Sequence, residues 1–406
     1  MLRKNFRGLG WLFGMMVLLS IACGSDINID LVPSNATVVN VVANSSLQPW
    51  LETAVSNFNE SEAETAEDNP AFVLIEYIDS GSASESSDGQ TAGWIPEEPV
   101  WSAVLAQQGN AAFQANCSSV ATSPLVIGMW RDVAESLGWP GLPLGWLDVG
   151  SLAADPSAWN YYSGGIYGER FRLGHTHPGL SGSGASPLLA IVQAAQSQTT
   201  AVSTVDIQQP IVQASVGAFE GGVTWFSSNT ATLGSTMAER GTSFLGAGIM
   251  YESDVLAYGG GNIVPVYPLE GTFMATHPAC INDGLEAEVA DAAAQFRNYL
   301  LGFEGQETAV SVGLRSGLLG PIAEGPFASD IVDLSQPQSV FAPPSVETIF
   351  AVQDVWQAAR KDVNLVMLID TSGSMSRSKM ANVREAAVQF VEQMGDEDII
   401  SIYAFH

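Results

Sequence analysis

The hydrophobic pattern near the start of the chain alternates between strand-like and helix-like segments. Residues 38–43 (VVNVVA) are rich in β-branched side chains, which predicts a buried strand. In residues 47–58 the apolar side chains recur every three or four positions, which predicts a helix with Ser46 as a candidate N-cap. Residues 71–78 (AFVLIEYI) predict a second strand. The order strand, helix, strand indicates a parallel α/β sheet.

The same alternation continues further along the chain. Apolar runs predict strands at 124–129, 245–249, 263–267 and 271–281. Helical periodicity predicts helices at 131–138, 285–301 and 304–311. Residues 316–347 combine Gly and Pro with little periodicity, so we predict a linker over 316–350.

A further strand–helix–strand pattern occupies the last residues. LVMLI (365–369) is an apolar run of the kind that is buried on both faces of a parallel sheet, and 375–394 has one apolar stripe typical of a helix. IISIYAF (399–405) predicts the next strand. The turn after the first strand offers one carboxylate and two hydroxyls, those of Asp370, Ser372 and Ser374. Oxygen ligands of this kind suit a hard divalent cation such as Mg²⁺.

The N-terminus has the pattern of a secretory signal. A positively charged start precedes an apolar run over residues 9–22, which is too short for a membrane span. LSIAC (19–23) resembles a bacterial lipobox, with Ser20 where Leu is usual. The resemblance implies a signal peptide at 1–22 and a lipidated Cys23 that anchors the protein to the cell membrane, on its extracytoplasmic side. The alternative is an ordinary secretory signal with an incidental cysteine.

Composition and charge narrow the classes of function. Hydrophobic residues make up 46% of the chain and charged residues 14%, which is typical of a globular protein. The net charge of −29 repels phosphate backbones, so we expect no nucleic-acid partner. The sequence has no G-x-S-x-G, H-E-x-x-H or P-loop motif and only four histidines, so we predict that it is not an enzyme.

Two cysteines remain once Cys23 is assigned to lipidation, namely Cys117 and Cys280. An oxidising compartment outside the cytoplasm allows them to form one disulfide. Two buried free thiols are the alternative, because the sequence does not place the two Cα atoms within bridging distance.

Four clusters of small polar residues follow predicted strands and precede predicted helices. In chain order they are Asn44-Ser45-Ser46, Ser80-Gly81-Ser82, Thr122-Ser123 and Ser181-Gly182-Ser183. In an open α/β sheet such positions meet at the carboxyl ends of the strands, where hydroxyl and backbone N–H groups can bind an anion or a small polar solute. Each cluster alone could be a helix cap or a turn, but the four together favour a ligand-binding cleft. Trp94 could be a wall of this cleft or a core residue.

Several stretches, in their order along the chain, resemble the extracytoplasmic solute-binding proteins of bacterial transport systems, most of all the two-lobed class of molybdate and sulfate receptors. They include ANSSLQPWLETAVSNF, IDSGSAS, ATSPLVIGMWRDVAESLGWP and LGHTHPGLSGSGASPLLAIVQAA. The resemblance covers about residues 36–315 and follows a tether at 23–36. It implies an α/β fold of two lobes joined by crossing strands, with the ligand in the cleft. Lobe 1 is expected at about 37–122 and 268–315, and lobe 2 at about 123–267.

The D-x-S-x-S pattern of the C-terminal turn resembles the metal-ion-dependent adhesion site of von Willebrand factor A-type (VWA) domains. The resemblance implies the first part of a doubly wound, Rossmann-like domain at 351–406, with Asp370, Ser372 and Ser374 as ligands of Mg²⁺ or another divalent cation. That family completes its site with a Thr and an Asp from later loops, which this sequence does not reach. We therefore expect the chain to be a fragment or truncated, and the metal to bind only in a complete domain.

Together these interpretations predict a membrane-anchored extracytoplasmic binding protein with a solute-binding-like cleft and a metal-dependent VWA domain for adhesion. The expected partners are a protein or glycan at the VWA domain, a small polar or anionic solute in the cleft, and the membrane. The alternative is the substrate-binding receptor of an ABC-type transport system. The fused VWA-like segment favours the first hypothesis, because a receptor has to dock on a permease and leave it again.

Overall fold

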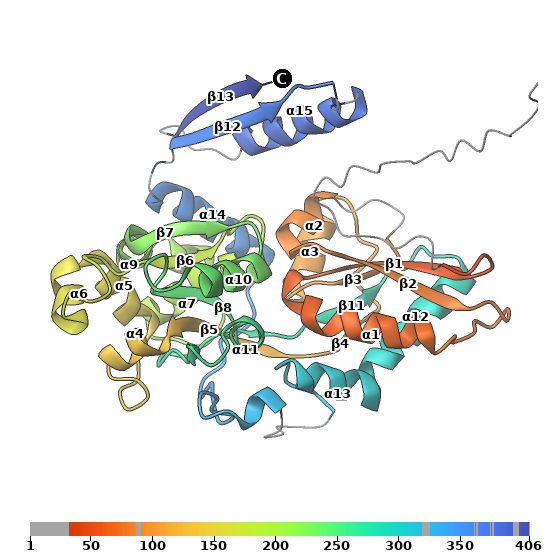
Figure 1. The fold of residues 1–406 in the computed structure, drawn as a ribbon, viewed down its shortest axis with the longest axis horizontal. Helices are drawn as coiled ribbons and strands as arrows, with labels where there is room; N and C mark the ends of the chain where they lie inside the picture. Colours follow the sequence, from red (N-terminus) through yellow and green to blue (C-terminus); the bar gives the residue numbers. More distant parts are fainter. Residues whose placement is uncertain are drawn as a thin grey trace, which may run out of the picture. The chain divides into compact units, whose positions relative to one another are not determined.

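Two mixed sheets, each covered by helices, account for most of the protein (Figure 1). The computed structural model describes residues 32–86, 91–318, 325–360, 362, 364–373, 375, 377–392 and 398–405. The predicted signal peptide, Cys23 and Ser374 lie outside the described residues. Within the described residues, no helix combines the length and the apolar character that a membrane span needs.

The first sheet, with its helices, is called lobe 1. Its strands are ordered β2-β1-β3-β11-β4, and they are β1 (Thr37–Ala43), β2 (Ala71–Tyr77), β3 (Gly93–Ile95), β4 (Cys117–Ser119) and β11 (Pro278–Ile281). β1 is parallel to β2 and β3, whereas β11 is antiparallel to β3 and β4. The helices are α1 (Gln48–Glu60), preceded by a 3-10 turn at Ser45–Leu47, α2 (Ser80–Ser86), α3 (Val100–Gln107), α12 (Ala287–Leu301) and α13 (Phe303–Ser311).

Alternation along β1 explains how the core of lobe 1 forms. Val39, Val41 and Ala43 are buried, while Asn40 between them is exposed. The apolar face of α1 completes this core, and the ring of Phe58 packs edge to face on Phe296 of α12, with 5.2 Å between the ring centroids. The two-residue alternation of β1 and the 3.6-residue period of α1 therefore place their apolar side chains in the same core.

The second sheet, with its helices, is called lobe 2. Its strands are ordered β10-β5-β8-β6-β7 with β9 paired to β5, and they are β5 (Ser123–Trp130), β6 (Leu173–Thr176), β7 (Val223–Ser227), β8 (Ala247–Tyr251), β9 (Ile263–Val266) and β10 (Met274–Ala275). Its helices are α4 (Arg131–Ser136), α5 (Trp146–Ala154), α6 (Pro156–Ser163), α7 (Gly182–Gln196), α8 (Thr204–Ile207), α9 (Pro210–Gly222), α10 (Thr230–Arg240) and α11 (Glu252–Tyr258). β5 is buried on both faces over all but its last residue, as a central strand should be.

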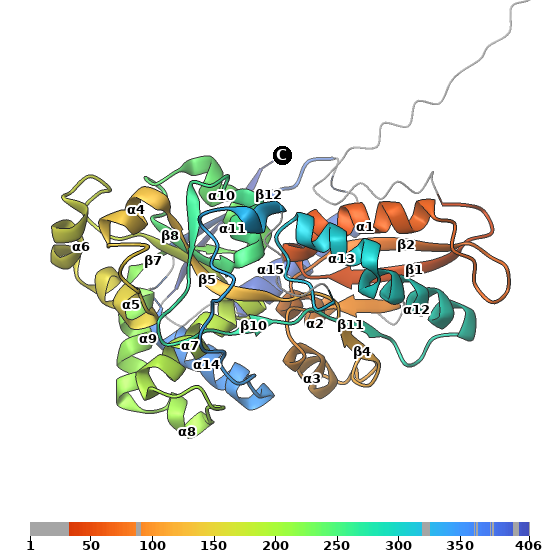
Figure 2. The same cartoon turned by 90° about the horizontal axis from the view of Figure 1, so that it is seen from below.

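Within the described residues, two strand-to-strand connections lead from one sheet to the other (Figure 2). The first crossing joins the end of β4 to the start of β5, around Thr122. The second runs from β10 to β11, so the single strand predicted over 271–281 is in fact two short strands in different sheets. An antiparallel bridge between Thr122 and Arg315 lies beside the first crossing. Paired crossings of this kind are where two lobes can rotate against each other.

Helix α14 (Val346–Ala359) spans the predicted boundary between the linker and the VWA segment at residues 350 and 351. It packs on α7 and α9 of lobe 2, and Trp356 Nε1 donates a hydrogen bond to Glu220 Oε2 at 3.1 Å. Gln353 donates to the backbone oxygen of Pro178 at 3.0 Å. Residues 351–359, which the predicted boundary assigned to a separate domain, thus pack on the second lobe.

The C-terminal residues form a β–α–β unit, as the pattern predicts. β12 (Asn364–Asp370) and β13 (Ile399–Phe405) pair in parallel, and α15 (Arg377–Glu392) connects them in sequence. Their apolar side chains are largely exposed, and Leu368 on β12 retains 67% of its accessible surface. The larger Rossmann-like VWA domain expected from the resemblance is not shown by the described residues.

Candidate ligand-binding cleft

The predicted polar clusters of lobe 1 and lobe 2 meet around two buried carboxylates, Asp79 and Glu97. Asp79 follows β2 and directly precedes α2, while Glu97 follows β3. Both side chains are almost fully removed from solvent, with 2% and 0% of their surface exposed. Three of the four clusters donate hydrogen bonds to one or both of them, so the clusters line a common polar junction.

Asp79 joins the two lobes. Its Oδ1 accepts from the side-chain amide of Asn44 at 3.2 Å and from the backbone N–H of Ser45 at 3.1 Å, both at the end of β1. Its Oδ2 accepts from the backbone N–H of Thr230 at 3.1 Å and from the Thr230 hydroxyl at 3.2 Å. Because Thr230 is the first residue of α10, this carboxylate caps a helix of the opposite lobe.

Glu97 makes an equivalent junction with α7. Its Oε1 accepts from Asn44 Nδ2 at 2.6 Å, from the Ser181 hydroxyl at 3.3 Å and from the backbone N–H of Gly182 at 3.1 Å. Its Oε2 accepts from the Ser80 hydroxyl. Both oxygens of Glu97 are therefore used, and they connect lobe 1 to the N-terminus of a long helix in lobe 2.

A chain of hydroxyl groups extends this junction into lobe 2. The Ser181 and Ser183 hydroxyls are 2.9 Å apart, and Ser183 is 2.6 Å from the Thr230 hydroxyl and 2.7 Å from that of Thr176. All four side chains are buried. Each of these hydroxyl groups can either donate or accept a hydrogen bond. The same groups can therefore bond to one another or to a different partner.

A second pair of buried acids, Glu98 and Asp254, lies in the same region but is less well satisfied. Glu98 Oε1 accepts from the Ser186 hydroxyl at 3.1 Å, and Asp254 Oδ2 accepts from the Ser46 hydroxyl and the Tyr251 backbone N–H, each at 3.1 Å. In the described part of the chain, the other oxygen of each carboxylate has no hydrogen-bond partner. The Tyr251 hydroxyl also has none.

Burial shifts the pKa of all four acids upward. Loss of hydration raises the pKa of Glu98 and that of Asp254 to about 7. Burial also raises the pKa of Asp79, and burial together with the nearby charge of Asp79 raises that of Glu97 well above its usual range. The region thus carries four carboxyl groups that resist ionisation when nothing positive is near.

The remaining predicted cleft residues lie at the edges of this region. Ser82 donates its backbone N–H to the oxygen of Leu180 at 3.0 Å, and an added Cβ on Gly81 would lie 2.2 Å from the Gly179 oxygen, so α2 is pressed against the loop before α7. Ser123 accepts from the Ser253 backbone N–H at 3.1 Å. Thr122 exchanges backbone hydrogen bonds with Arg315 at the crossing, away from the two carboxylates.

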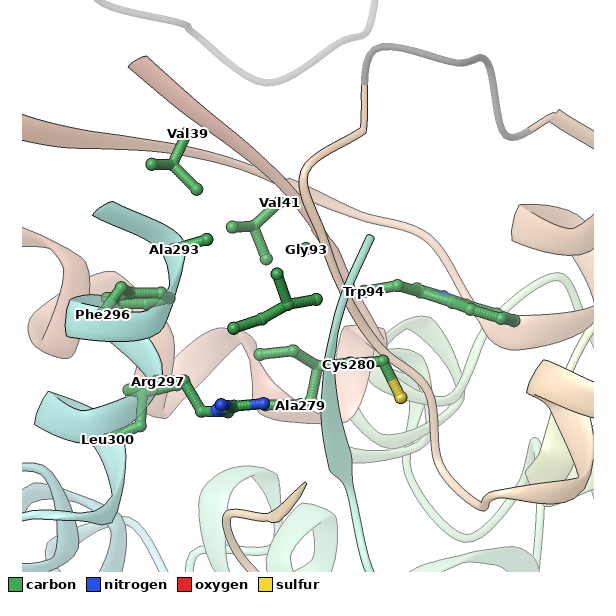
Figure 3. Close-up of a pocket in the computed structure, with 12 residues that line it drawn as sticks. Val39, Val41, Gly93, Trp94, Ala279, Cys280, Ala293, Phe296, Arg297 and Leu300 are labelled. Carbon is green, nitrogen blue, oxygen red and sulfur yellow. The ribbon is translucent and has the colours of Figure 1, made fainter. Parts of the chain in front are cut away.

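Trp94 is a core residue in this structure. It is buried, and its ring packs edge to face on Phe113 with 5.8 Å between centroids. Figure 3 shows Phe296 and Ala293 of α12 facing Val39 across a small cavity, while the side chain of Trp94 points away from them. The cavity measures about 20 Å³ and its lining is mainly apolar, so it has room for about one water and no solute.

Cys117 and Cys280 form a disulfide between β4 and β11. The bond links strands that are paired in lobe 1, next to both crossings between the lobes. Of the two alternatives left open by the sequence, the structure contains the disulfide.

The predicted metal loop is described only in part. Asp370 ends β12, and its Oδ1 accepts the backbone N–H of Ser372 at 2.7 Å, while Ser374 lies outside the described residues. This hydrogen bond lowers the pKa of Asp370. Across the described positions, no group of three or more His, Cys, Asp or Glu side chains is arranged to hold a metal ion.

The sequence pattern pointed to hydrogen-bond donors of these acids, such as Asn44, Ser80 and Ser181, but not to the acids themselves. Asp79, Glu97, Glu98, Asp254 and Thr230 were not candidates. The signal that could have found two of them is the pair Glu97-Glu98 in WIPEEPVW, because adjacent carboxylates in an apolar stretch are rare unless they have partners. Asp79 likewise stands directly before the Ser80 cluster.

Residues 39–315 match the family model described as bacterial extracellular solute-binding protein. None of the curated proteins compared matches the chain. The fold expected from the sequence, two α/β lobes, is also that of solved structures of low sequence identity. The match does not extend to the C-terminal residues after 315.

Three of these structures illustrate the similarity. A periplasmic thiamin binding protein has a TM-score of 0.59 at 10% identity, with 80% of this chain and 97% of that chain covered. The periplasmic binding protein AfuA from Actinobacillus pleuropneumoniae, with fructose-6-phosphate bound, has a TM-score of 0.54 at 17% identity, with the same coverage. The sulfate-binding protein SubI from Mycobacterium tuberculosis has a TM-score of 0.51 at 16% identity, covering 70% of this chain and 88% of that chain.

Proposed function

Since the chain belongs to the family of bacterial extracellular solute-binding proteins, we propose that it is the substrate-binding receptor of an ABC-type transport system. In this function the two lobes close on a small solute, and a permease in the membrane accepts the loaded protein. The family match favours this hypothesis over the adhesion hypothesis preferred from the sequence, because it covers both lobes and none of residues 316–406.

The observation that carries the proposal is the polar junction between the lobes. Asp79 and Glu97 of lobe 1 accept hydrogen bonds from Thr230, Ser181 and Gly182 of lobe 2. An interface that has to open must present groups that water can solvate, and buried hydroxyls and carboxylates meet this requirement better than a dry apolar contact does. The two crossings supply the hinge.

Native mass spectrometry of the full chain, purified from its own cells, tests the proposal. A receptor should carry a stoichiometric adduct of small mass that is lost on denaturation. An empty protein in repeated preparations, together with no binding in a broad solute screen, would contradict the receptor function and return attention to the adhesion hypothesis.

The cellular location forms part of the same proposal. A receptor of this family works outside the cytoplasm, and Cys23 would hold it at the membrane through its lipid. A Cys23→Ala variant should move from the detergent-rich to the aqueous phase of a phase-separation experiment. Equal partitioning of the two proteins would show that Cys23 carries no anchor.

For the C-terminal unit we propose a role as an accessory interaction module for a protein or glycan. Asp370 and Ser372, with Ser374, would hold Mg²⁺ and leave a coordination position for an oxygen of the partner. The carboxylate of Asp370 supports this, because its hydrogen bond from Ser372 favours the ionised form that a cation requires. Calorimetric titration of the wild type with Mg²⁺ should show a weak heat of binding, and the Asp370→Ala variant should show none. Equal heats of binding for the two proteins would exclude this site.

A further inference from the structure

At the junction of the two lobes, the N-termini of α7 and α10 are already occupied by carboxylates of the protein, so they are not available to an anion. The first backbone N–H groups of α7 and α10 are the donors that would bind a negatively charged solute between the lobes. Here the Gly182 N–H donates to Glu97 and the Thr230 N–H donates to Asp79. An incoming sulfate or phosphate would have to displace a covalently attached carboxylate and would meet its negative charge.

Positive charge is also missing from the junction. In the described ranges, no Lys or Arg pairs with Asp79, Glu97, Glu98 or Asp254. The nearby arginine at the crossing, Arg315, is engaged by Glu252 through two hydrogen bonds, at 2.7 and 2.6 Å. Burial lowers the pKa of His277, whose ring lies against Tyr251, to about 3, so it adds no charge near neutral pH.

Several buried polar groups in the described part of this region lack the partner that buried groups normally have. They include Glu98 Oε2, Asp254 Oδ1 and the Tyr251 hydroxyl, on side chains that are 5%, 1% and 0% exposed, as well as the Ser253 hydroxyl and both ring nitrogens of His277. A buried carboxylate oxygen without a donor is costly, so a ligand that donates a hydrogen bond to it would lower the free energy of the site. Two acceptors and a hydroxyl are complementary to a ligand that donates hydrogen bonds.

The Tyr251 side chain lies beside these acids. Asp254 Oδ2 accepts the Tyr251 backbone N–H at 3.1 Å, and the Tyr251 ring packs against His277, whose backbone N–H donates to the Glu97 carbonyl oxygen at 3.1 Å. The pKa of Tyr251 is raised well above its usual range by burial and then by the charges of Glu97, Glu98, Asp79 and Asp254. The aromatic face of Tyr251 adds a surface on which an organic cation can lie.

We propose that the polar junction between the two lobes of this receptor binds an organic cation. Its ammonium group would lie against Glu98, Asp254 and the Tyr251 hydroxyl, while Asp79 and Glu97 take the place of a ligand anion at the helix N-termini. A bare metal ion fits less well, since the described acids are not gathered into a group of three that could coordinate one. This inference rests on the proposed receptor function and names its substrate class.

The test is calorimetric titration of the full chain with two sets of probes. Spermidine and arginine are the cations, and sulfate, molybdate and fructose 6-phosphate are the anions. We expect at least one cation to bind and no anion to do so. The Glu98→Gln and Asp254→Asn variants should each weaken the cation by at least about tenfold, because each removes a charge-assisted hydrogen bond. The Glu67→Gln variant, which changes an exposed acid, should bind like the wild type.

A second readout separates a ligand contact from a structural effect. Binding of a cation should ionise Glu98 and Asp254, so near pH 7 it should release protons, measured as a dependence of the binding heat on the buffer. The same dependence should be smaller in the two variants. Asp79, Glu97, Tyr251 and His277 face these acids, and among them the histidine is neutral at this pH and the tyrosine remains protonated.

The outcomes separate the two proposals. Anion binding without cation binding would overturn the cation inference and leave the receptor function intact. Cation binding that neither variant weakens would overturn the assignment to Glu98 and Asp254. If no probe of either set binds and native mass spectrometry also finds no adduct, both the inference and the receptor function fail.

Discussion

The two pairs of buried acids between the lobes have the same chemistry but different surroundings. Asp79 and Glu97 use both of their oxygens, and their donors come from both lobes. Glu98 and Asp254 are equally buried, yet each leaves one oxygen without a donor in the described part of the protein. We therefore call Asp79 and Glu97 the saturated pair and Glu98 and Asp254 the unsaturated pair.

The difference between the two pairs shows that burial alone does not define the role of a carboxylate. A carboxylate whose lone pairs are all used contributes to the structure, and removing it leaves several donors without partners. A carboxylate with an oxygen that accepts no hydrogen bond lowers the stability of the empty protein. A ligand that donates a hydrogen bond to this oxygen can restore the lost stability. Substitutions at the two pairs should accordingly change stability in opposite directions.

The largest effect is expected from the saturated pair. In an Asp79→Asn variant, one oxygen becomes an NH₂ group that faces other donors, either Asn44 and Ser45 or Thr230. Each buried donor that loses its acceptor should lower the free energy of unfolding by about 1–3 kcal/mol. Urea unfolding followed by tryptophan fluorescence measures this. A loss no larger than that of the exposed control Glu67→Gln would show that the pair does not join the lobes.

The unsaturated pair should behave in the opposite way. In Glu98→Gln the carbonyl oxygen can keep the hydrogen bond from Ser186, and the amide takes the place of the oxygen that has no donor. Because the buried charge is gone, we expect the empty protein to gain on the order of 2–3 kcal/mol at pH 8. Urea unfolding at pH 8 and pH 5 tests this, and a destabilised variant at pH 8 would refute it. The gain should shrink at pH 5, where wild-type Glu98 is protonated.

The pH dependence of the wild type provides the next test. The pKa of Glu98 and that of Asp254 are about 7 in the folded protein, above the values of about 4 expected when unfolded. At these two sites the folded state therefore binds more protons, and their contribution to stability falls as pH rises from 6 to 8, by about 1.4 kcal/mol for each group. His177 and His277 have lowered pKa values, about 4 and about 3, so their contribution rises with pH and opposes this fall at the lower end of the window, where the unfolded histidines still bind protons.

Urea unfolding of the empty protein at pH 6, 7 and 8 measures this slope. The Asp254→Asn variant is the matched control, because its amide oxygen can still accept from Ser46 and Tyr251. Because only the Asp254 contribution is removed, the change in stability between pH 6 and pH 8 should differ from that of the wild type by about 1.4 kcal/mol. Equal slopes would mean that Asp254 does not titrate in this range.

The smallest effect is expected where one donor of the unsaturated pair is removed. Ser46→Ala takes away one of the two hydrogen bonds to Asp254 Oδ2 and leaves that from Tyr251. We expect a loss of about 1 kcal/mol at pH 8 and less at pH 5, where the carboxyl is protonated. A loss that is the same at both pH values would argue that Ser46 acts as a helix residue and not as a partner of the acid.

Much of the local structure follows from the sequence. The apolar run at 38–43 and the helical spacing at 47–58 correspond to β1 and α1, and the periodicity of 285–301 corresponds to α12. Polar clusters at the ends of strands could also be predicted, because the strand–loop–helix order places them there. Short helices such as α8 and the split of residues 271–281 between two sheets could not, since their patterns are brief and their partners distant.

Burial depends on what the rest of the chain provides. SPLVIGMW and NLVMLID are similar apolar strands, yet β5 is buried on both faces, whereas Val366 and Leu368 on β12 are 57% and 67% exposed. Sequence specifies that each segment prefers to be a strand. It does not specify which helices cover it.

The sequence by itself determined the class of fold, the positions of several long elements such as β1, α1 and α12, and the polar character of the loops at the strand ends, because these depend on neighbouring residues. The tertiary structure alone decided which side chains meet there. Asp79 and Thr230 are 151 residues apart, and Glu97 and Gly182 are 85 apart. No local pattern encodes such pairs. Only the packing of the two lobes brings a carboxylate of one lobe to a helix N-terminus of the other. The same packing leaves one oxygen of Glu98 and one of Asp254 without a hydrogen-bond donor in the described residues.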